Sequence, residues 1–426
     1  MFRSAFMCAA TMLLSLPAFA GTLCVNPAGT HGCKKTIQSA VEAAAPGDTI
    51  NVAPGTYAED VVVDRAIALM GADPDSTVID ATGLSNGINV DGYDHPGLSH
   101  VIIRGFTVRN ANHQGIVVTN ASQVTILGNH VTRNDRALQV NTGGPPSCPG
   151  LPPYLVAFQG FDCGEGIQLS GVTYSTVSDN LVDHNSGGIL VSDDTAPNHD
   201  NFITGNVVRD NPYDCSITLA THDLNPVQGL PAKGVYRITV KGNIVTRNGL
   251  ASGEGAGVGI FAPTPGSRNF GNVIVDNTLA NNGLPGVTLH SHAPGQNVND
   301  HLIANNTIYG NGPDEESGSS EKAGIAITAD PGAGPITGIR IIGNRIYAEG
   351  VDVVFSAPGE LAAHQNDFLD KIGVANLGSG SVDATLNWWK CSRGPGKPGC
   401  ASTEGANIQV MPWLERPNVD DDDRDH

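Results

Sequence analysis

The stretch GNHVTRN at residues 128–134 recurs along the chain with few changes. Each copy has Asn at its second position and an apolar residue two positions later, and most copies end in a second Asn. The other copies are DNLVDHN at 179–185, GNVVRDN at 205–211, GNIVTRN at 242–248, DNTLANN at 276–282, NNTIYGN at 305–311, and the divergent GNRIYAE at 343–349 and QNDFLDK at 365–371. Short β-type segments repeating every 20 to 40 residues or so are typical of a solenoid, in which each repeat buries its apolar side against its neighbours.

The first Asn of each copy has a structural interpretation. Asn tolerates left-handed backbone angles, and its side-chain amide can bond to an Asn one coil above or below. Neighbouring coils are expected at the strand spacing of about 4.8 Å, so these residues should form a ladder inside the solenoid. The expected ladder contains Asn129, Asn180, Asn206, Asn243, Asn277, Asn306 and Asn344.

A second run follows each Asn phrase and contains two apolar residues separated by one residue. Examples are GIQLSG from Gly166, GILVSDD from Gly188, GVGIFAP from Gly257 and GVTLHSHA from Gly286. These runs are expected to stack as one parallel sheet. Insertions between repeats, at 143–164, 223–234 and 312–322, are where such a solenoid usually builds the walls of a groove.

The composition favours a single elongated domain. The chain has 426 residues, of which 53 are Gly, 15% are charged and 40% are apolar, which suits short strands joined by tight turns. We expect a signal peptide at 1–20, an N-terminal cap and opening segment at 21–60, the solenoid with its insertions at 61–390, a closing segment at 391–415, and an acidic disordered tail at 416–426.

Two features predict export. The first residues carry a basic start at Arg3, an apolar run and a small-x-small site that ends at Ala20, so we expect a secreted or periplasmic protein cleaved near Ala20. After loss of Cys8, six cysteines form close pairs that an exported chain can oxidise: Cys24 with Cys33, Cys148 with Cys163, and Cys391 with Cys400. Cys215 is left over, either as a buried thiol or as a nucleophile with His222 nearby.

The net charge of the chain limits the kinds of molecule that it can bind. The formal net charge is −19, which opposes binding to nucleic acid and to anionic membranes. It also opposes an anionic polysaccharide, whereas neutral glycans, cations and proteins stay open. No segment after the signal is long and apolar enough for a membrane span, and we expect a monomer.

Residues 37–63, IQSAVEAAAPGDTINVAPGTYAEDVVV, begin with helical spacing of apolar residues and continue as short β-runs. This opening resembles that of right-handed parallel β-helix proteins of the pectin-lyase-like superfamily, and the repeats from Gly128 to Lys371 resemble that superfamily's repeat. The resemblance implies an all-β fold, a right-handed parallel β-helix with a short N-terminal capping helix. That scaffold hosts lyases, hydrolases, esterases, epimerases and adhesive proteins, so the resemblance leaves activity open.

Strand alternation assigns one set of side chains to the outer face of the expected sheet. If Ile189 and Val191 point inward, this outer face is polar, rich in histidine and exposed. It carries Gln168, Ser170, Leu190, Ser192, Asp194, Thr218, Ala220, His222, Phe261, Thr288, His290, His292, Thr328 and Asp330. Asp194 and His222 should lie on adjacent coils, and His292 two coils further, beside Asp330.

This face suits acid–base chemistry, because a carboxylate orients an imidazole and raises its pKa. We therefore predict catalytic roles for Asp194, His222, His292 and Asp330. Substrate-binding roles are predicted for Gln168, Ser192, Thr218 and His290. The sequence identifies no cofactor, but His222, His290 and His292 leave a divalent metal open. The competing interpretation is a polar outer face that only keeps an exported solenoid soluble.

Two functional hypotheses follow. The first is an exported β-helix that binds or processes a polysaccharide on the outer face, as a lyase, hydrolase or epimerase if it is an enzyme. The second is a non-enzymatic surface or periplasmic solenoid for adhesion, partner binding or metal binding. Active-site patterns of the superfamily are mostly absent, since only Asp193-Asp194 matches the polygalacturonase-like Asp-Asp segment.

Overall fold

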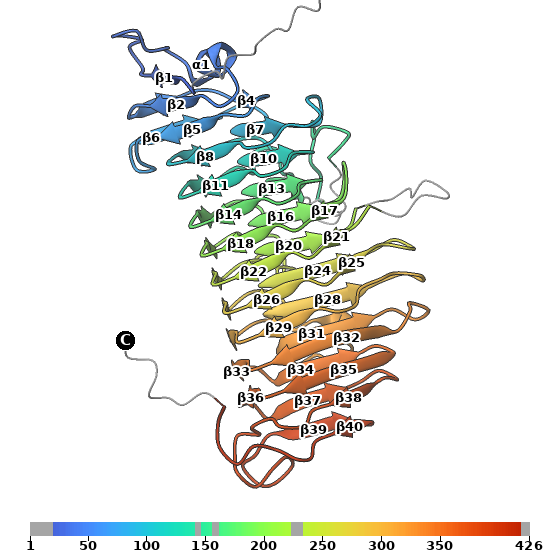
Figure 1. Cartoon of the computed structure of the whole chain (residues 1–426). Helices are drawn as coiled ribbons and strands as arrows, with labels where there is room; N and C mark the ends of the chain where they lie inside the picture. The colour runs from blue at the N-terminus through green and yellow to red at the C-terminus, as the bar shows by residue number, and fades with distance from the viewer. Residues whose placement is uncertain (1–19, 141–145, 156–161, 223–232, 419–426) are drawn as a thin grey trace, which may run out of the picture.

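The computed structural model describes residues 20–140, 146–155, 162–222 and 233–418. The expected signal peptide lies outside these ranges except for Ala20, as does most of the expected acidic tail. Figure 1 shows a stack of coils whose strands form long parallel sheets from the N-terminal to the C-terminal end. No helix in the described ranges is long and apolar enough to span a membrane.

Three large sheets form the walls of the stack. The 14-stranded sheet contains β1 (Thr22–Val25), β2 (Thr49–Val52), β5 (Ala68–Gly71), β8 (Ile102–Arg104), β11 (Thr125–Leu127), β14 (Thr176–Ser178), β18 (Phe202–Thr204), β22 (Thr239–Lys241), β26 (Val273–Val275), β29 (Leu302–Ala304), β32 (Ile336–Ile342), β35 (Gly359–His364), β38 (Ser381–Asp383) and β40 (Ile408–Gln409). The 11-stranded sheet contains β3 (Gly55–Tyr57), β6 (Thr77–Asp80), β9 (Thr107–Arg109), β12 (His130–Thr132), β15 (Leu181–Asp183), β19 (Val207–Arg209), β23 (Ile244–Thr246), β27 (Thr278–Ala280), β30 (Thr307–Tyr309), β33 (Arg345–Tyr347) and β36 (Asp367–Phe368).

The 12-stranded sheet carries the runs that follow the Asn phrases. It contains β4 (Val61–Val63), β7 (Ile88–Asp91), β10 (Ile116–Thr119), β13 (Ile167–Ser170), β16 (Ile189–Ser192), β20 (Ile217–Ala220), β24 (Val258–Ala262), β28 (Val287–Ser291), β31 (Ala323–Ala329), β34 (Val351–Ser356), β37 (Ile372–Asn376) and β39 (Ser402–Gly405). A small sheet of β17 (Asn198–His199), β21 (Val235–Tyr236) and β25 (Asn269–Phe270) lies beside it.

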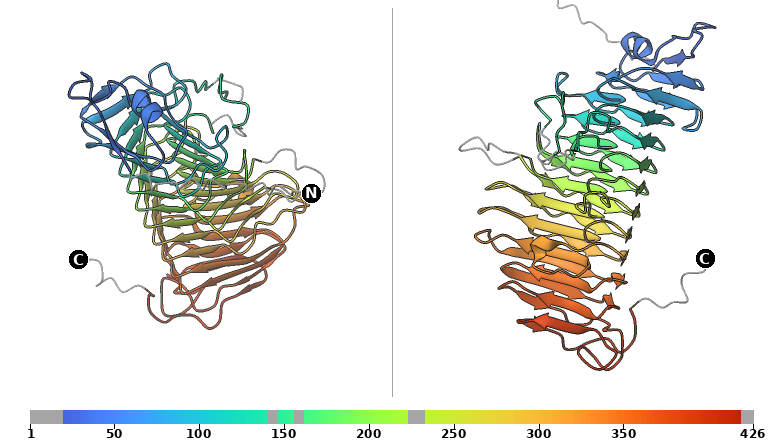
Figure 2. Two further views of the ribbon diagram at one scale, coloured as in Figure 1. Left: turned by 45° about the horizontal axis from the view of Figure 1, so that its top comes forward. Right: turned by 180° about the vertical axis from the view of Figure 1, so that it is seen from behind.

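Each coil contributes one strand to each of the three large sheets in turn. After β11 the chain turns at Asn129 into β12, and the next strand, β13, belongs to the 12-stranded sheet. Each strand pairs in parallel with its counterparts one coil away, so the side chains of successive coils are in register. Figure 2 shows this regular stacking from two further directions. The expected all-β, right-handed parallel β-helix is confirmed.

Buried asparagines link successive coils. Asn129 Nδ2 donates to Asn180 Oδ1 at 3.0 Å, and Asn180 Nδ2 donates to Asn206 Oδ1 at 3.0 Å. Each amide oxygen also accepts a backbone N–H of the preceding coil, as Asn180 Oδ1 does from Asn129 at 2.9 Å. The expected ladder is therefore present, and it continues through Asn366 to Asn387. It satisfies polar groups that would otherwise be buried without partners.

The second Asn of the phrase forms another buried ladder. Asn134, Asn185, Asn211, Asn248, Asn282 and Asn311 are linked in that order by side-chain amide bonds. The two divergent phrases lack the second Asn, and the ladder ends at acidic residues that they contain. Glu349 accepts from Asn311, and Asp370 accepts from the backbone N–H of Glu349.

Helix α1 (Ile37–Ala43) covers the first coils, as the helical spacing predicts. Thr36 caps it by accepting a hydrogen bond from Ser39 N at 3.2 Å. The helix buries Ile37, Ala40 and Val41 against the stack, so the open end of the first coil is shielded.

The cysteine pairs are confirmed. Disulfides join Cys24 to Cys33, Cys148 to Cys163 and Cys391 to Cys400. Cys215 is free and buried. Its Sγ accepts from Ala256 N at 3.2 Å, and burial, with the charge of Asp214 added, raises the pKa of the thiol well above its usual range. A thiol that resists ionisation is a poor nucleophile, so Cys215 is a packing residue.

Candidate functional site

The outer side chains of the 12-stranded sheet lie in straight rows. Gln168, Leu190 and Thr218 face out at equivalent places on β13, β16 and β20. The neighbouring row contains Ser192, Ala220, Phe261, His290 and Thr328. Just beyond the strand ends, Asp194, His222 and His292 continue the rows in the order that strand alternation predicts.

The expected exposure of this face is wrong for most of these residues. Gln168, Ser192, Thr218, Thr288 and His290 are all buried. Other segments contact them from outside the sheet: Gln114 bonds to Gln168, and Asp314 of the acidic insertion bonds to Thr288 and His290. In the C-terminal half, the short 3₁₀ helix η2 (Glu315–Ser317) packs on β31 and β34. Outward-facing residues of β31, β34 and β37 form a separate apolar cluster there: Ala323, Ala326, Val351, Val354 and Ala375.

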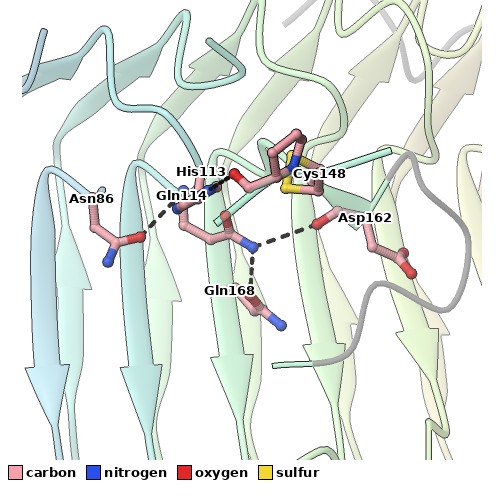
Figure 3. Close-up of a disulfide and its surroundings, with 8 residues drawn as sticks. Asn86, His113, Gln114, Cys148, Asp162 and Gln168 are labelled. Carbon is pink, nitrogen blue, oxygen red and sulfur yellow. Dashed lines mark hydrogen bonds between the residues drawn. A yellow bond between two sulfur atoms is a disulfide. The ribbon is translucent and has the colours of Figure 1, made fainter. Parts of the chain in front are cut away.

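The disulfide-bonded insertion covers the central strands. Figure 3 shows Gln114 between its neighbours: its Nε2 donates to Gln168 Oε1 at 2.6 Å and to the backbone oxygen of Asp162 at 3.4 Å. His113 Nε2 bonds to the backbone oxygen of Pro149, close to Cys148. Gln168 is therefore occupied by contacts inside the protein, including a bond to Asp194 Oδ2 at 3.2 Å.

Asp194 and His222 form a buried pair on adjacent coils. His222 Nδ1 is 2.9 Å from Asp194 Oδ1, and its Nε2 is 3.8 Å from Asp162 Oδ2. Asp193 accepts backbone N–H bonds from His222 and Gly234, both at 2.6 Å, which holds the turn in place. Burial alone would lower the pKa of His222, but attraction by Asp194 and Asp162 outweighs it and raises the pKa to about 9.

A hollow opens beyond the strand ends beside this pair. Its volume is about 410 Å³ when the space open to solvent is counted. Its lining includes two histidines, His222 and His292, and Phe261 from the strand of the coil between them. The ring of Phe261 lies over Gly259, where a Cβ atom would clash with it. The lining residues are Asp162, Asp214, Thr218, Ala220, Thr221, His222, Phe261, Pro263 and His292.

A second group lies two coils further along the sheet. His290, His292 and Glu316 each offer one ligand atom, and these atoms lie within 4.8 Å of one another. His290 Nε2 is 2.7 Å from Asp314 Oδ2, and Thr288 Oγ1 donates to the same oxygen at 2.6 Å. His290 Nδ1 faces Glu316 Oε2 at 3.2 Å. His292 Nδ1 is 3.2 Å from Asp330 Oδ2, so the predicted neighbours His292 and Asp330 do meet.

The predicted set of His222, His290 and His292 is not brought together at ligand spacing among the described residues. His222 pairs with Asp194 and Asp162, whereas Glu316 joins the other two histidines. His222 and His292 instead line the same hollow. The two imidazoles of His290 and His292 and the carboxylate of Glu316 suit a divalent transition metal. The bond from His290 to Asp314 fixes the orientation of the ring, as hydrogen-bonded carboxylates do for metal-binding histidines.

Three buried carboxylates lie together at the hollow, of which Asp162 and Asp214 line it. Asp162, Glu165 and Asp214 each place one oxygen within 4.8 Å of the others. Burial, and then the charge of Asp162, raises the pKa of Asp214 to about 7. Burial also raises the pKa of Glu165 well above its usual range, with further contributions from Asp214 and Asp162.

Five further acidic residues of these groups are not predictable from the strand pattern: Asp162, Glu165, Asp214, Asp314 and Glu316. All five lie outside the regular strands, in insertions or in the segments just before a strand. Strand alternation does not reach such positions. The available signal was composition alone, since the insertion at 312–322 is visibly acidic.

The stacked parallel coils define a right-handed parallel β-helix protein. Residues 157–393, more than half of the chain, match the family model described as "Periplasmic copper-binding protein (NosD)". The chain belongs to this NosD family. Residues 26–263 also match a family described as a protein of unknown function, DUF1565. No curated protein matches the chain.

Solved structures share the fold at low sequence identity. The catalytic unit of a GH87 α-1,3-glucanase from Streptomyces thermodiastaticus is 14% identical, with a TM-score of 0.49 over 96% of this chain and 72% of that chain. The Geobacillus virus E2 protein ORF18 is 12% identical, with a TM-score of 0.41 over 93% of this chain. The Dettilon tailspike protein gp208 is also 12% identical, with a TM-score of 0.48 over 88% of this chain. The chain spans only 61% and 64% of the lengths of these last two proteins.

Proposed function

We propose that this chain is an exported β-helix protein that binds or processes a neutral polysaccharide at the hollow beside His222 and His292. The single observation that carries the proposal is this convergence: two histidines, which follow strands two coils apart, line one open space together with Phe261 of the strand between those two. A concave site with an aromatic wall and a few convergent polar groups is the usual form of a ligand pocket.

The proposed glycan-binding region is smaller than the outer sheet face that the sequence predicts. Because Gln168, Ser192, Thr218 and His290 are buried, we do not expect a glycan to lie along the whole sheet face. Contact is restricted to the strand ends, where the imidazole of His292 is 27% exposed. Asp194 orients His222 by its 2.9 Å bond, and Asp330 does the same for His292 at 3.2 Å. These four residues keep their proposed catalytic roles.

The net charge supports a neutral glycan, and the disulfides support export to an oxidising compartment. The net charge of −19 and the acidic wall of the hollow disfavour an anionic polymer. Disulfides suit an oxidising compartment, and the family description names a periplasmic protein.

The test exposes the mature protein to a panel of neutral and acidic polysaccharides and measures binding, new reducing ends and absorbance from unsaturated sugars. We expect binding or product with a neutral polymer, and its loss in His292→Ala and in His222→Gln. His95→Ala is the matched control, because His95 is 45% exposed and is not among the residues that line the hollow. Silence across the panel, or full activity in both variants, contradicts the proposal.

A second candidate function is binding of a divalent transition metal by His290, His292 and Glu316. The specific observation is their ligand spacing, with Asp314 and Thr288 fixing His290 from behind. The family description names copper, and imidazole with carboxylate ligands suits Cu²⁺. A metal held there would act as a Lewis acid at the edge of the hollow, or would be carried as cargo.

This candidate is tested by titrating the protein with Cu²⁺ and following the electron paramagnetic resonance of bound copper. We expect one bound ion, loss of its signal in His292→Ala, and about tenfold weaker binding in Asp314→Asn, because the carboxylate no longer orients His290. His222→Gln should bind copper as the wild type does. Unchanged copper binding in His292→Ala removes the candidate.

A further inference from the structure

The three buried carboxylates come from different parts of the chain. Asp162 lies near the end of the disulfide-bonded insertion, Glu165 directly follows it before β13, and Asp214 lies just before β20. Strands β13 and β20 are separated by β16, so the group spans two coil steps. The insertion is therefore joined to the body of the solenoid at this point.

The coil that contains β16, between β13 and β20, leaves room for the side chain of Glu165. Gly187 lies just before β16, and a Cβ atom at this position would clash with both oxygens of the Glu165 carboxylate. The backbone of Gly187 does not have a positive φ, so the missing side chain is a matter of space. The carboxylate lies in the gap that glycine leaves.

Among the three carboxylates, Glu165 is buried without any group of the described residues that would stabilise its charge. Its side chain is buried, with 1% of the residue exposed, and neither carboxylate oxygen has a hydrogen-bond partner among the described residues. Asp214 differs, because its Oδ1 accepts from Cys215 N at 2.6 Å. A buried carboxylate without donors costs several kcal/mol in protein interiors, so its place in the fold calls for a partner of positive charge.

We propose that Asp162, Glu165 and Asp214 bind a hard divalent cation, Ca²⁺, that pins the disulfide-bonded insertion to the solenoid. The three ligand atoms are all carboxylate oxygens within 4.8 Å of one another. Oxygen ligands without nitrogen or sulfur select Ca²⁺ or Mg²⁺ rather than copper or zinc, and a Glu that can bind through both oxygens favours the larger Ca²⁺. His222 does not supply the missing positive charge at Glu165. Its Nε2 faces Asp162 and its Nδ1 is bound to Asp194, so neither ring nitrogen pairs with the Glu165 carboxylate.

A proton is the competing partner for Glu165. Burial raises the pKa of this carboxyl, so a neutral acid at this place is the physical alternative to a bound cation. The two alternatives differ in their response to metal. A neutral acid gives no saturable Ca²⁺ binding, whereas a cation site gives one bound ion and a more stable protein.

The experiment uses the mature protein freed of metal with a chelator, titrated with Ca²⁺ by calorimetry and by thermal unfolding. We expect one Ca²⁺ per chain and a rise in Tm of about 3 °C at roughly a hundredfold excess over Kd. Glu165→Gln keeps the size of the side chain and removes its charge, so it should fold but lose both responses. Glu360→Gln, at an exposed position on β35, is the matched control and should keep both.

Two results would overturn the site. One is the absence of saturable binding of Ca²⁺, Mg²⁺ or Mn²⁺ to the wild type. The other is a Ca²⁺ response in Glu165→Gln equal to that of the wild type, which would place the ion elsewhere. Neither readout involves a glycan or copper, so the outcome is separate from the fate of the proposed function.

Discussion

Glu349 Oε1 accepts hydrogen bonds from both the backbone N–H and the side-chain amide of Asn311, each at 3.0 Å. A carboxyl group thus takes the place that asparagine occupies in the preceding coils of this ladder. An amide oxygen there is neutral, but a carboxylate carries a charge into the interior. Asp352 and Asp370 lie beside it and add two more acidic groups.

Stability should fall with rising pH because of Glu349. Burial raises its pKa to about 8 from an ordinary value of 4.5, partly offset by the Asn311 bonds. The folded protein therefore holds this proton more tightly than the unfolded chain does. Its stabilising effect is complete below pH 4.5 and is lost as pH rises towards 8, at a cost on the order of 2 to 4 kcal/mol.

Glu349→Gln tests this dependence, since Gln can accept the same bonds without a charge. We expect a higher thermal midpoint than wild type at pH 8 and a shallower fall between pH 5 and pH 8. Glu360→Gln, at an exposed position on β35, should leave the fall unchanged. Parallel curves for wild type and Glu349→Gln would show that the carboxyl is not the cause.

A buried histidine should make the protein sensitive to acid. His301 Nδ1 accepts from Asn272 N at 3.2 Å, and Nε2 donates to the Asn269 carbonyl at 3.0 Å, so the ring is neutral. Burial lowers its pKa to about 4 from 6.5. Its contribution is complete above pH 6.5 and is lost as pH falls towards 4.

The measurement compares thermal midpoints of wild type and His301→Asn at pH 7 and pH 4.5. Asparagine takes the equivalent place at Asn272, where its oxygen accepts from Ile238 N. We therefore expect the variant to fold and to lose less stability in acid. His95→Asn, at a surface position, should behave as wild type, and an equal loss of stability in His301→Asn would exclude His301 as the acid-sensitive group.

Removing an asparagine from the centre of the Asn ladder should lower the stability of the protein. Asn243 accepts from the backbone and side chain of Asn206, and donates to the Ile203 carbonyl and to Asn277 Oδ1, all within 3.0 Å. Asn243→Ala leaves several buried groups unpaired, and we expect a loss of about 3 kcal/mol in chemical denaturation. Asn51→Ala, at an exposed position on β2, should change stability by less than about 0.5 kcal/mol.

The central disulfide should control access to the sheet. Replacing Cys148 and Cys163 together by Ala removes a bridge across 15 residues, which is worth about 3 kcal/mol. We expect a lower thermal midpoint and faster hydrogen exchange in β13, because the insertion no longer holds Gln114 and Gln168 together. The same change at Cys391 and Cys400 should not affect exchange in β13. Equal protection in both double variants would contradict this role.

The repeat made the fold predictable. An Asn at a fixed place in each phrase can bond to its equivalent on the next coil, so the phrases indicate the stacking of Asn129 on Asn180 and beyond. The period of two then assigns inward and outward positions along each strand, and Asp194 does meet His222.

Exposure could not be predicted in the same way. Alternation says which way a side chain points, but not what lies above it. Gln168 and His290 point outward and are nevertheless buried, because Gln114 and Asp314 reach them from other segments. The acids that complete both clusters, including Glu165 and Glu316, lie in segments without a repeat, where no register applies.

The direction of the hydrogen bonds has a mechanical consequence. Strands of successive coils pair side by side, so their backbone bonds run along the length of the stack, as do the amide bonds between Asn206 and Asn243. A force that pulls the two ends apart would load these bonds one coil after another instead of sharing the load among them. The molecule should therefore yield to tension by peeling single coils from an end, while sideways shear meets the resistance of whole sheets.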